Sequence, residues 1–600
     1  MHYEVWRSLP DMFFRQAEHR SGQPFLWSKR DGVFQPITYG EAAQQVKLFA
    51  RGLRDLGIRP GDRVALISEN RPEWLVADMA IMTAGAITVP TFTTNTTADH
   101  QYILAHSGAR AAIVSTRTIA KTLLPAAIEA PELEFVVSME DLGLAQQPTA
   151  PVVSWAEVMD RGEARPDDSA EMMAELRRDA VCCFIYTSGT GGTPKGVMLT
   201  HGSILANCMG AYHLLVDYFG VHKEVFLSFL PLSHAYEHTA GQFFPISIGA
   251  EIYYAESVEK LTDDMATVRP TIMTAVPRLY EVMHHRIMRT VDKTEGLQKK
   301  LFLLAHELGR QKYERPGSLT LWQRILDLVA ELLVRRKVRR RFGGRLKALV
   351  SGGAALSYDI GLFFTALGVR ILQGYGQTEA SPVVSANPPG RIKLRTVGPP
   401  VKGAELRIAE DGEVLVRGEL VMKGYWRDAQ ATAAVIRDGW LHTGDIGEID
   451  DEGYLKITDR KKDIIVLSGG DNVAPARIEG FLVLQPEINQ AMVHGDKRPH
   501  LVALLVPERD FILDWARANG KSADLAALAT DGDFHRALGG AVDRVNARLS
   551  RIEKIRRFAI VPEPFTIENE MMTPSLKIRR HKIRAAHGQM MEKLYEKATG

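Results

Sequence analysis

A segment rich in hydroxyl groups and glycine runs from Tyr186 to Gly196 and reads YTSGTGGTPKG. Glycine lets backbone N–H groups approach an anion closely, and side-chain hydroxyls add further donors. A lysine near the end of the segment supplies a positive charge. The apolar run 180–185 predicts a buried strand that leads into this loop. We therefore predict a triphosphate-binding loop with the candidate residues Thr187, Ser188, Gly189, Thr190 and Lys195.

This loop differs from the common phosphate-binding loop, which has Gly before its Lys and Ser or Thr after it. Here Pro194 precedes the lysine and Gly196 follows it. The next residues, 197–200, predict a second strand, whereas the common loop opens a helix. The alternative is a flexible surface loop of Gly and Thr. We disfavour it, because a strand leads in and Pro-Lys-Gly closes the loop.

A second candidate motif, QGYGQTE, spans residues 373–379 and follows the strand-like run 369–372. Ligands of open α/β sheets lie beyond the carboxyl ends of strands, so this position suits a binding site. The ring of Tyr375 can stack on a base, Thr378 can donate to a phosphate, and the Glu379 carboxylate can hold Mg2+. A strand-ending turn with a surface glutamate is the alternative, and the phosphate loop upstream makes us disfavour it.

Two further segments could contribute to a nucleotide site. In WLHTGD, residues 440–445, the carboxylate of Asp445 can accept hydrogen bonds from the two vicinal hydroxyls of a ribose. Taken singly, this aspartate could equally be a turn residue. The run 349–356 is another strand-to-glycine transition, and alone it is a weak signal.

In their order along the chain, these motifs resemble those of the adenylate-forming (ANL) superfamily, which includes acyl-CoA synthetases, luciferases and peptide-synthetase adenylation domains. The resemblance covers nearly the whole chain. It implies that ATP couples a carboxylate to AMP and releases pyrophosphate, with Mg2+ neutralising the phosphates. The chain departs from the family pattern at Gly191, where a second Thr or Ser is usual, so one hydroxyl of the phosphate loop is missing.

The resemblance also implies roles for single residues. It implies that Tyr375 stacks on adenine, that Thr378 grips the α-phosphate and that Glu379 orders the metal. An ammonium group is needed where charge builds on the reacting oxygens as pyrophosphate leaves. The other implied positions are Gly353, Ala354 and Gly376 around adenine, Asp445 and Arg460 at the ribose, Gly469 beside the pantetheine of coenzyme A, and the catalytic Lys577.

Within the superfamily, the chain resembles the long-chain fatty-acid–CoA ligases. This likeness rests on LPLSHAYEHTAG at 230–241, on the stretch 335–357 and on the ending SLKIRR. It implies that His234 lies near the acyl carboxylate as a catalytic candidate and that Tyr236 lines an acyl tunnel. On spacing alone, a buried core histidine fits His234 equally well. The implied reaction forms acyl-AMP from ATP and a fatty acid, and then a thioester with coenzyme A.

Other functions remain open at this point. An acyl-AMP ligase that passes its product to a carrier protein would share every ATP motif. So would an acyl-CoA synthetase for a medium-chain or aryl acid. A non-catalytic relative is disfavoured, because the chain retains the four implied functional residues Glu379, Asp445, Arg460 and Lys577. A membrane-scaffold role would rest only on the basic helix around Arg335.

Composition and charge limit the class of protein. The 600 residues carry 74 Lys and Arg against 72 Asp and Glu, a net charge of +2, which argues against nucleic-acid binding. The three cysteines, Cys182, Cys183 and Cys208, have no spacing suited to a metal or a disulfide framework. No run approaches the ~18 apolar residues that cross a bilayer. We expect a cytoplasmic protein, peripheral at most at the inner face of a membrane. The oligomeric state stays open.

The elements that must position these residues alternate between strand-like and helical patterns up to about residue 450, which indicates α/β architecture. Strands are expected at 62–67, 111–114 and 346–350, and helices at 39–56 and 74–84. The superfamily resemblance implies a large N-terminal domain of two α/β sheet subdomains plus a small distorted β-barrel, followed by a small mobile α+β domain.

From residue 414 the pattern changes to short strands and turns, and a mixed α/β pattern follows. We place the domain boundary at Lys462. Residues 1–461 would form the AMP-binding domain, and residues 462–600 a lid that carries the catalytic lysine and the loop on the coenzyme A side. The stretch 146–168, which contains Pro and acidic residues, is expected to be a surface connection.

Residues 278–345 are charged and have a helical period. Apolar residues recur in this stretch at spacings of three and four, and the basic run 335–341 follows directly. A basic amphipathic helix can lie on an anionic membrane, or it can pack on its own domain with its charges solvated. We favour packing, because the apolar face is no wider than packing needs. The apolar residues are Trp322, Ile325, Leu326, Val329, Leu332 and Leu333.

Overall fold

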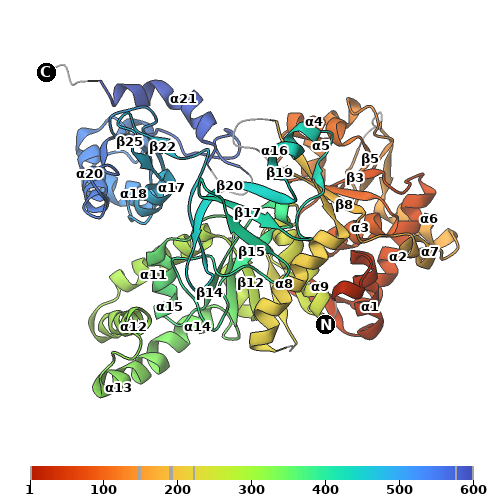
Figure 1. Cartoon of the computed structure of the whole chain (residues 1–600), viewed down its shortest axis with the longest axis horizontal. Helices are drawn as coiled ribbons and strands as arrows, with labels where there is room; N and C mark the ends of the chain where they lie inside the picture. Colours follow the sequence, from red (N-terminus) through yellow and green to blue (C-terminus); the bar gives the residue numbers. More distant parts are fainter. Residues whose placement is uncertain are drawn as a thin grey trace.

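Two eight-stranded sheets organise most of the chain before residue 430 (Figure 1). The computed structural model describes residues 3–144, 150–187, 193–220, 223–257, 259–573 and 578–596. One hydrophobic core contains side chains from both sheets, such as Phe226 and Ile252 from the first and Val64 and Leu66 from the second. The two sheets therefore share an interior, which confirms the α/β prediction.

The first sheet has six parallel strands with one antiparallel strand at each edge. Its inner strands are short apolar runs, as expected where helices cover both faces. In spatial order the strands are β15 (Val383–Ala386), β14 (Ile371–Gly376), β13 (Ala348–Ser351), β12 (Ile272–Ala275), β10 (Val225–Ser228), β11 (Glu251–Tyr254), β1 (Pro24–Arg30) and β2 (Val33–Thr38).

The second sheet is parallel from β8 to β7 and ends in two antiparallel pairs. Its strands, in spatial order, are β18 (Gly424–Tyr425), β9 (Lys195–Thr200), β8 (Val181–Thr187), β4 (Ile87–Pro90), β3 (Arg63–Ile67), β5 (Ala109–Val114), β6 (Phe135–Ser138) and β7 (Val152–Ser154). The predicted strands at 62–67, 111–114, 180–185 and 197–200 are all present.

Helices surround both sheets, and α3 is buried on nearly every side. The predicted helices at 39–56 and 74–84 are α2 and α3. The helices of this part are α1 (Leu9–His19), α2 (Tyr39–Asp55), α3 (Pro72–Thr83), α4 (Thr97–Ser107), α5 (Arg117–Ile128), α6 (Trp155–Ala164), α7 (Ser169–Ala174), α8 (His201–Phe219), α9 (Phe244–Ile248), α10 (Leu261–Val268), α11 (Pro277–Lys293), α12 (Gly296–Glu314), α13 (Leu321–Ala330), α14 (Arg336–Arg341) and α15 (Tyr358–Ala366). Shorter helical segments are η1 (Tyr3–Val5), η2 (Glu237–Phe243), η3 (Glu331–Arg335) and η4 (Thr378–Ala380).

A five-stranded antiparallel sheet follows and corresponds to the predicted small barrel. It consists of β16 (Glu405–Ile408), β17 (Glu413–Arg417), β20 (Trp440–Ile449), β19 (Ile436–Arg437) and β21 (Leu455–Arg460), with α16 (Ala429–Val435) beside it. The pairing of β20 with β21 sets Asp445 directly opposite Arg460.

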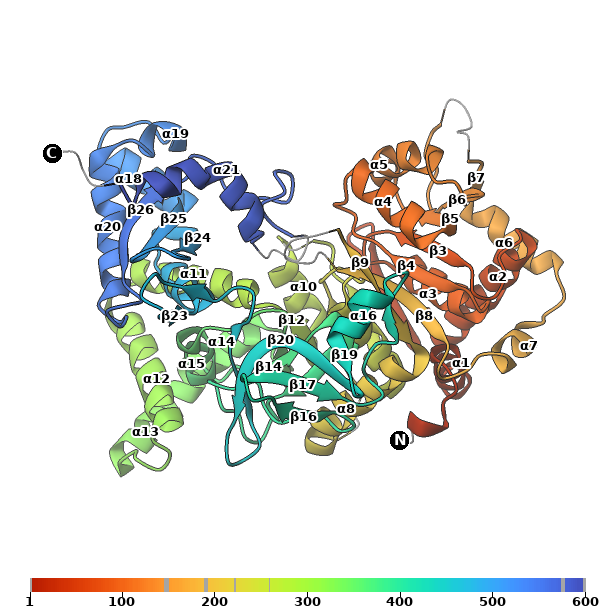
Figure 2. The same ribbon diagram turned by 45° about the horizontal axis from the view of Figure 1, so that its top comes forward.

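The C-terminal part forms a separate lobe, drawn in blue, beside α11 (Figure 2). It has its own hydrophobic core, which begins at Ile465. Its elements are β22 (Ile465–Val466), β23 (Asn472–Val473), α17 (Pro475–Leu482), β24 (Ile488–His494), β25 (Leu501–Pro507), α18 (Arg509–Ala518), α19 (Leu525–Leu528), α20 (Gly532–Asn546), β26 (Ile555–Ile560) and α21 (Arg580–Lys593). The boundary at Lys462 remains a prediction.

The expectation of a surface connection at 146–168 is wrong for most of that stretch, because β7 and α6 lie within it. Helix α6 packs closely on α2 through two glycines. A Cβ at Gly162 would lie 1.8 Å from the Leu48 carbonyl oxygen, and one at Gly52 would lie 2.0 Å from the Val158 carbonyl oxygen. The polar composition of the stretch concealed a helix that tertiary packing stabilises.

A buried charged pair links α3 to η2. The His238 Nε2 atom lies 2.8 Å from Asp78 Oδ2, Gln242 donates to the same oxygen at 3.0 Å, and both members of the pair are fully buried. Burial alone would lower the pKa of His238, but the Asp78 carboxylate outweighs it and raises that pKa to about 10. The imidazole is therefore charged at neutral pH.

This pair predicts a pH-dependent contribution to stability. The pKa of His238 is higher in the folded state than its unfolded value of roughly 6.5, so the charged pair contributes its full stabilisation at pH values below 6.5. This contribution is lost as the pH rises through about 10. The difference in unfolding free energy between wild type and Asp78→Asn should therefore shrink with rising pH, by at most about 1.4 kcal/mol per pH unit. Urea unfolding followed by tryptophan fluorescence measures it. A difference independent of pH would contradict the charged pair.

Candidate functional site

Three neighbouring parallel strands, β12, β13 and β14, end at the same edge of the first sheet. Of the predicted positions, Gly353 and Ala354 follow β13, Gly376 is the last residue of β14, and Thr378 and Glu379 follow β14. Gly353 has a φ of +83°, which an L side chain rarely adopts, and it lies exposed at this edge together with Ala354. The structure therefore gathers the predicted adenine, phosphate and metal positions at one sheet edge.

The turn after β14 needs a glycine at the last position of the strand. A Cβ at Gly376 would lie 1.7 Å from the carbonyl oxygen of Pro382. Asn207 on α8 holds the far side of the same turn, since its Nδ2 donates to the carbonyls of Ala380 at 3.2 Å and Val383 at 2.7 Å. Close backbone approach and a buried amide thus fix the position of Glu379. No sequence motif had pointed to Asn207.

Asp445 is buried and hydrogen-bonded on both of its oxygens. The Tyr375 hydroxyl donates to Oδ2 at 2.6 Å, and Arg460 Nε donates to Oδ1 at 2.9 Å. Burial, together with the neighbouring Asp445 carboxylate, raises the pKa of Tyr375, so its hydroxyl stays protonated as a donor. A carboxylate has about four acceptor positions, which leaves capacity for ribose hydroxyls. The three predicted residues are thus in direct contact.

The predicted phosphate loop joins β8 to β9, and Thr187 pairs with Lys195 at its base. Ser188, Gly189, Thr190 and Gly191 lie outside the described residues. The Lys195 ammonium is 3.4 Å from Asp428 Oδ2 and 5.0 Å from the centre of the Tyr425 ring. The lysine therefore lies beside the residues 425–428.

Tyr425 connects the phosphate loop to the predicted metal ligand. Its hydroxyl donates to Glu379 Oε1 at 2.8 Å, while its ring faces Lys195. Burial and the Glu379 carboxylate raise the pKa of Tyr425, so this donor also stays protonated. Sequence reasoning missed Tyr425. The aromatic pair that follows Gly424 was the signal that could have drawn attention to it.

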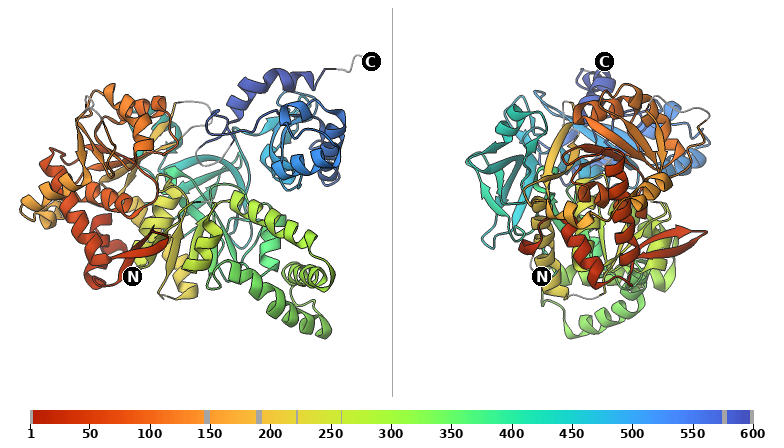
Figure 3. Two further views of the ribbon diagram at one scale, coloured as in Figure 1. Left: turned by 180° about the vertical axis from the view of Figure 1, so that it is seen from behind. Right: turned by 90° about the vertical axis from the view of Figure 1, so that its right-hand side faces the viewer.

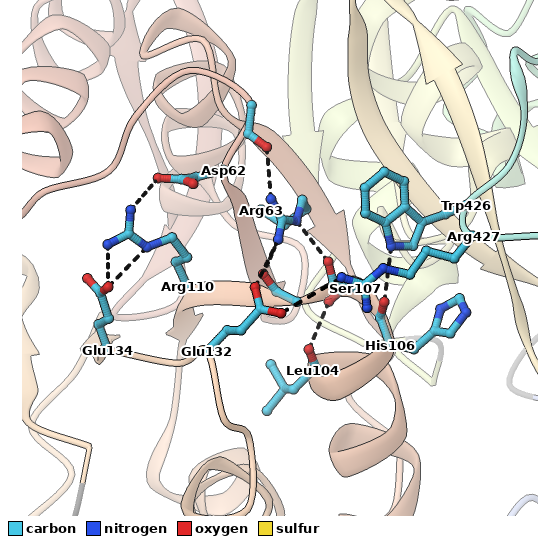
Figure 4. A network of polar contacts seen from close by, with 12 residues as sticks. Asp62, Arg63, Leu104, His106, Ser107, Arg110, Glu132, Glu134, Trp426 and Arg427 are labelled. Atoms are coloured by element: carbon cyan, nitrogen blue, oxygen red, sulfur yellow. Dashed lines mark hydrogen bonds and ion pairs between the residues drawn. The ribbon is translucent and has the colours of Figure 1, made fainter.

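The backbone on either side of Tyr425 bonds to η4, which follows β14 of the first sheet, and to β9 of the second sheet. Met422 N donates to the Glu379 carbonyl at 2.9 Å, and Trp426 N donates to the Gly196 carbonyl at 2.8 Å. We call residues 422–426 the bridging segment. The Trp426 indole also donates to the His106 carbonyl at 3.0 Å, and Figure 4 shows this contact within a larger polar network.

Contacts of the same group hold β8, the strand that leads into the predicted phosphate loop. The His106 ring lies 2.8 Å from the Tyr186 hydroxyl near the end of β8, and Arg63 donates to the Gly108 carbonyl. Arg63 also donates to the Ser107 carbonyl (Figure 4). Arg427 lies 3.8 Å from Glu132 in the same group. The strand that leads into the loop is therefore held by α4 and the bridging segment together.

His234 and Tyr236 lie between β10 and η2, close to the same sheet edge. The Tyr236 hydroxyl donates to the Val350 carbonyl at 2.8 Å, and its ring lies against Gly352, where a Cβ would be 3.0 Å away. The His234 Nδ1 atom accepts from the Tyr236 amide at 3.2 Å, and the histidine is only partly buried. The role of His234 at an acyl carboxylate and that of Tyr236 in a tunnel wall stay predictions.

Of the predicted positions in the C-terminal lobe, the structure describes Gly469, which makes no contact with this cluster. Gly469 lies in the exposed turn between β22 and β23, and a Cβ there would meet only Asp471 Oδ2, at 3.6 Å. Lys577 lies outside the described residues. Close to it in sequence, Arg580 forms an ion pair with Glu479 at 2.5 Å and lies near Asp459.

The lobe contacts the N-terminal part along α11. The His285 Nε2 atom lies 3.3 Å from the Val483 carbonyl, Arg278 donates to the Asn489 side chain, and Arg289 pairs with Asp510. Arg289 and Asp510 are largely exposed, so such polar contacts exchange readily with water. An interface of this kind is compatible with a lobe that changes orientation.

The donor set around Glu379 suits Mg2+ when the nucleotide supplies further oxygens. Within the described ranges, no three His, Cys, Asp or Glu side chains gather into a cation site. Mg2+ is commonly held by one or two carboxylates together with substrate phosphates and waters. A single half-buried carboxylate beside a phosphate loop meets that description.

Two family descriptions match the chain in succession. The description "AMP-binding enzyme" matches residues 13–426, and "AMP-binding enzyme C-terminal domain" matches residues 462–599.

Several proteins are similar over nearly the whole chain. The long-chain-fatty-acid–CoA ligases FadD15 of Mycobacterium bovis and Mycobacterium tuberculosis are each 35% identical over 581 residues, covering 94% of this chain and 93% of the relative. The peroxisomal long chain acyl-CoA synthetase 7 of Arabidopsis thaliana is 32% identical over 622 residues, covering 98% of this chain and 86% of its own.

Solved structures share the fold. The adenylation domain of a carboxylate reductase from Mycobacterium chelonae matches with a TM-score of 0.77 at 23% identity, covering 98% of this chain and 91% of that one. The anthranilate CoA ligase AuaEII, in complex with anthranoyl-AMP, matches with a TM-score of 0.73 at 21% identity, covering 98% and 99%.

The close approach at Gly376 yields a prediction. In Gly376→Ala the methyl group would overlap the Pro382 carbonyl, so the turn must move and displace Thr378 and Glu379. We expect ATP affinity, measured by titration calorimetry, to fall roughly tenfold or more. Gly480→Ala is the matched control, because a Cβ there has no neighbour within 4 Å. Unchanged ATP affinity in Gly376→Ala would contradict the assignment of this turn to the site.

Proposed function

Because this chain belongs to the AMP-binding enzyme family, we propose that it is an AMP-forming long-chain fatty-acid–CoA ligase. The observation that carries the proposal is the similarity to mycobacterial ligases of that name over 94% of the chain. The contacts of Tyr375 with Asp445 and of Tyr425 with Glu379, which bring predicted nucleotide and metal residues together, support it. ATP, a fatty acid and coenzyme A are then the three substrates.

In the first step, a fatty-acid carboxylate oxygen attacks the α-phosphorus of ATP, an O–P bond forms, and pyrophosphate leaves. Positioning and charge stabilisation supply most of the rate in such a displacement. We assign the polyphosphate to the loop closed by Lys195, the α-phosphate to Thr378 and the ribose to Asp445 and Arg460. Tyr375 holds Asp445 through its hydroxyl and offers its ring to the adenine.

Glu379 is our candidate ligand for Mg2+, which would neutralise phosphate charge when bound. Tyr425 donates to one carboxylate oxygen of Glu379 and thereby fixes its orientation. Lys195 lies next to that tyrosine. The ammonium and the metal-binding carboxylate would therefore face the same polyphosphate from two sides.

In the second step, the thiol of coenzyme A attacks the acyl carbonyl of acyl-AMP, a thioester forms, and AMP leaves. We assign Lys577 to the first step and the turn at Gly469 to the second. Both belong to the C-terminal lobe, so rotation about Lys462 is the simplest way to present them in turn. The polar contacts along α11 would be exchanged in that rotation.

We further propose a reducing compartment, the cytoplasm, as the place of action. The three cysteines are free and buried. Their side chains form no disulfide, which suits such a compartment.

A panel of carboxylic acids from acetate to long-chain and aromatic acids tests the substrate class. We expect AMP production with ATP and coenzyme A to be fastest for long-chain acids, with kcat/KM at least roughly a hundredfold above that for acetate. A preference for aryl acids would establish the alternative synthetase. AMP release without acyl-CoA formation would indicate an acyl-AMP ligase, and no AMP with any acid would indicate a non-catalytic relative.

The division of labour within the lobe gives a second test. Lys577→Ala removes an ammonium that stabilises charge at the α-phosphate, so adenylate formation should fall roughly 10²- to 10³-fold. Thioester formation from supplied acyl-AMP should stay within about twofold. Lys582→Ala is the matched control, because that lysine pairs with Glu570 on the surface. Equal loss of both half-reactions would refute the division.

A further inference from the structure

A helical arm projects from the first sheet at the end far from the second sheet. The arm comprises α12, α13, η3 and α14, residues 296–341, and it forms the lower left part of the molecule in Figure 1 and the lower right part in the left view of Figure 3. Helix α13 continues through η3 into α14 without a break, which confirms the helical pattern predicted for this stretch.

The arm leaves one apolar face uncovered. Leu321 is 79% exposed, Trp322 67%, Leu328 62% and Ile325 54%. Soluble proteins seldom expose so many large apolar side chains together. The other exposed members of this face are Val329, Leu332 and Leu333.

The expectation that this face packs on its own domain is therefore wrong. The opposite side of the helix makes the packing contacts, since Ala330 and Val334 are buried in the core of the first sheet's outer helices. Of the apolar residues predicted to form one face, only Leu326 is partly buried. Periodicity identified the apolar face but did not identify which side of the helix meets the domain.

The basic run at the end of the arm divides into two groups. Arg335 is buried and pairs with Asp327 at 2.7 Å, and Arg339 pairs with Glu331. These two arginines are structural. The other group is exposed and forms no ion pair within the described residues. It consists of Arg336, Lys337, Arg340 and Arg341.

The arm is rigidly attached. The Arg335 guanidinium donates to the carbonyl of Ala305 at 2.8 Å on α12 and to that of Ala366 at 2.9 Å on α15. Gly309 lets α12 approach α15 closely, because a Cβ there would lie 2.2 Å from the Ala366 carbonyl oxygen. Anything that binds the exposed face therefore holds the whole N-terminal part in place.

We propose that the arm docks the protein on an anionic lipid bilayer. A helix with tryptophan and leucine on one face and lysine and arginine beside it binds at the boundary between headgroups and acyl chains. The four exposed cations complement anionic headgroups. If a second copy of the chain covered this face instead, the same four cations of both copies would meet at the shared interface. No helix in the described part of the chain is long and apolar enough to cross the bilayer, so the attachment is peripheral.

Co-sedimentation of the full chain with vesicles tests the proposal. Wild type should bind vesicles of phosphatidylcholine containing phosphatidylglycerol, and the binding should weaken with salt. Replacing Trp322, Ile325 and Leu328 by Ser should lower the partition coefficient roughly tenfold or more. Replacing the four exposed basic residues by Gln should abolish the preference for anionic over pure phosphatidylcholine vesicles.

Matched control variants test whether vesicle binding depends on the arm itself and not on exposed apolar or basic side chains elsewhere on the protein. Val33→Ser, Ile128→Ser and Leu513→Ser remove exposed apolar side chains outside the arm and should leave binding unchanged. Four exposed arginines of the lobe serve as the charge control when changed to Gln: Arg509, Arg517, Arg551 and Arg556.

Three results would overturn the proposal. The first is that the wild-type protein stays in solution when anionic vesicles are sedimented. The second is that neither the Ser variant nor the Gln variant of the arm binds these vesicles less than wild type does. The third is a wild-type dimer, measured by sedimentation velocity, that the Ser variant converts to a monomer while vesicle binding is absent. That result would assign the face to a second copy of the chain.

Discussion

The bridging segment, residues 422–426, holds the two halves of the candidate site in register. Its backbone donates to the Glu379 carbonyl in η4, between strands β14 and β15 of the first sheet, and to the Gly196 carbonyl on β9 of the second. Buried backbone groups must find partners, so this short segment is committed to both sheets at once. The distance between the predicted phosphate loop and the turn that carries Glu379 depends on those bonds. Tyr425, at the middle of the segment, adds a side-chain contact to each half.

Charged groups at the site are held by protein partners before any substrate arrives. Asp445 lies between Tyr375 and Arg460, Glu379 accepts from Tyr425, and Lys195 lies near Asp428. Groups that are oriented in advance need no reorganisation when charge develops, which is the main source of electrostatic catalysis. The tyrosines suit this purpose because burial keeps their hydroxyls protonated. An exposed acidic group in place of these buried tyrosines would instead exchange its hydrogen bonds to Asp445 and Glu379 for hydrogen bonds to water.

Much of the fold and site could be predicted from sequence because the signals are local. A strand that leads into glycine and a polar turn defines both QGYGQTE, on the first sheet, and the predicted phosphate loop, on the second. Within the first sheet, the parallel strands β13 and β14 bring their turns to one edge. Gly376 is a clear case, since its close approach to Pro382 lies within one turn. Asn207 could not be predicted, because its partners lie far away in sequence and its surroundings carry no motif. The aromatic pair after Gly424 could have drawn attention to Tyr425, but not to its contact with Glu379, which is 46 residues away. The helix at 155–164 was missed for a related reason, because its packing on α2 depends on its own Gly162 and on Gly52, which is distant in sequence.

By itself, the sequence determined which segments form strands, helices and turns, and which residue types the turns carry. Periodicity also determined that residues 321–333 have an apolar face. Only the tertiary structure decided that this face points to solvent and that Arg335 is buried while Arg336 is not. It likewise decided that Asp445, Tyr375 and Arg460 are in contact. The physical reason is that a side chain's burial and partners depend on segments distant in the chain, which local patterns do not encode.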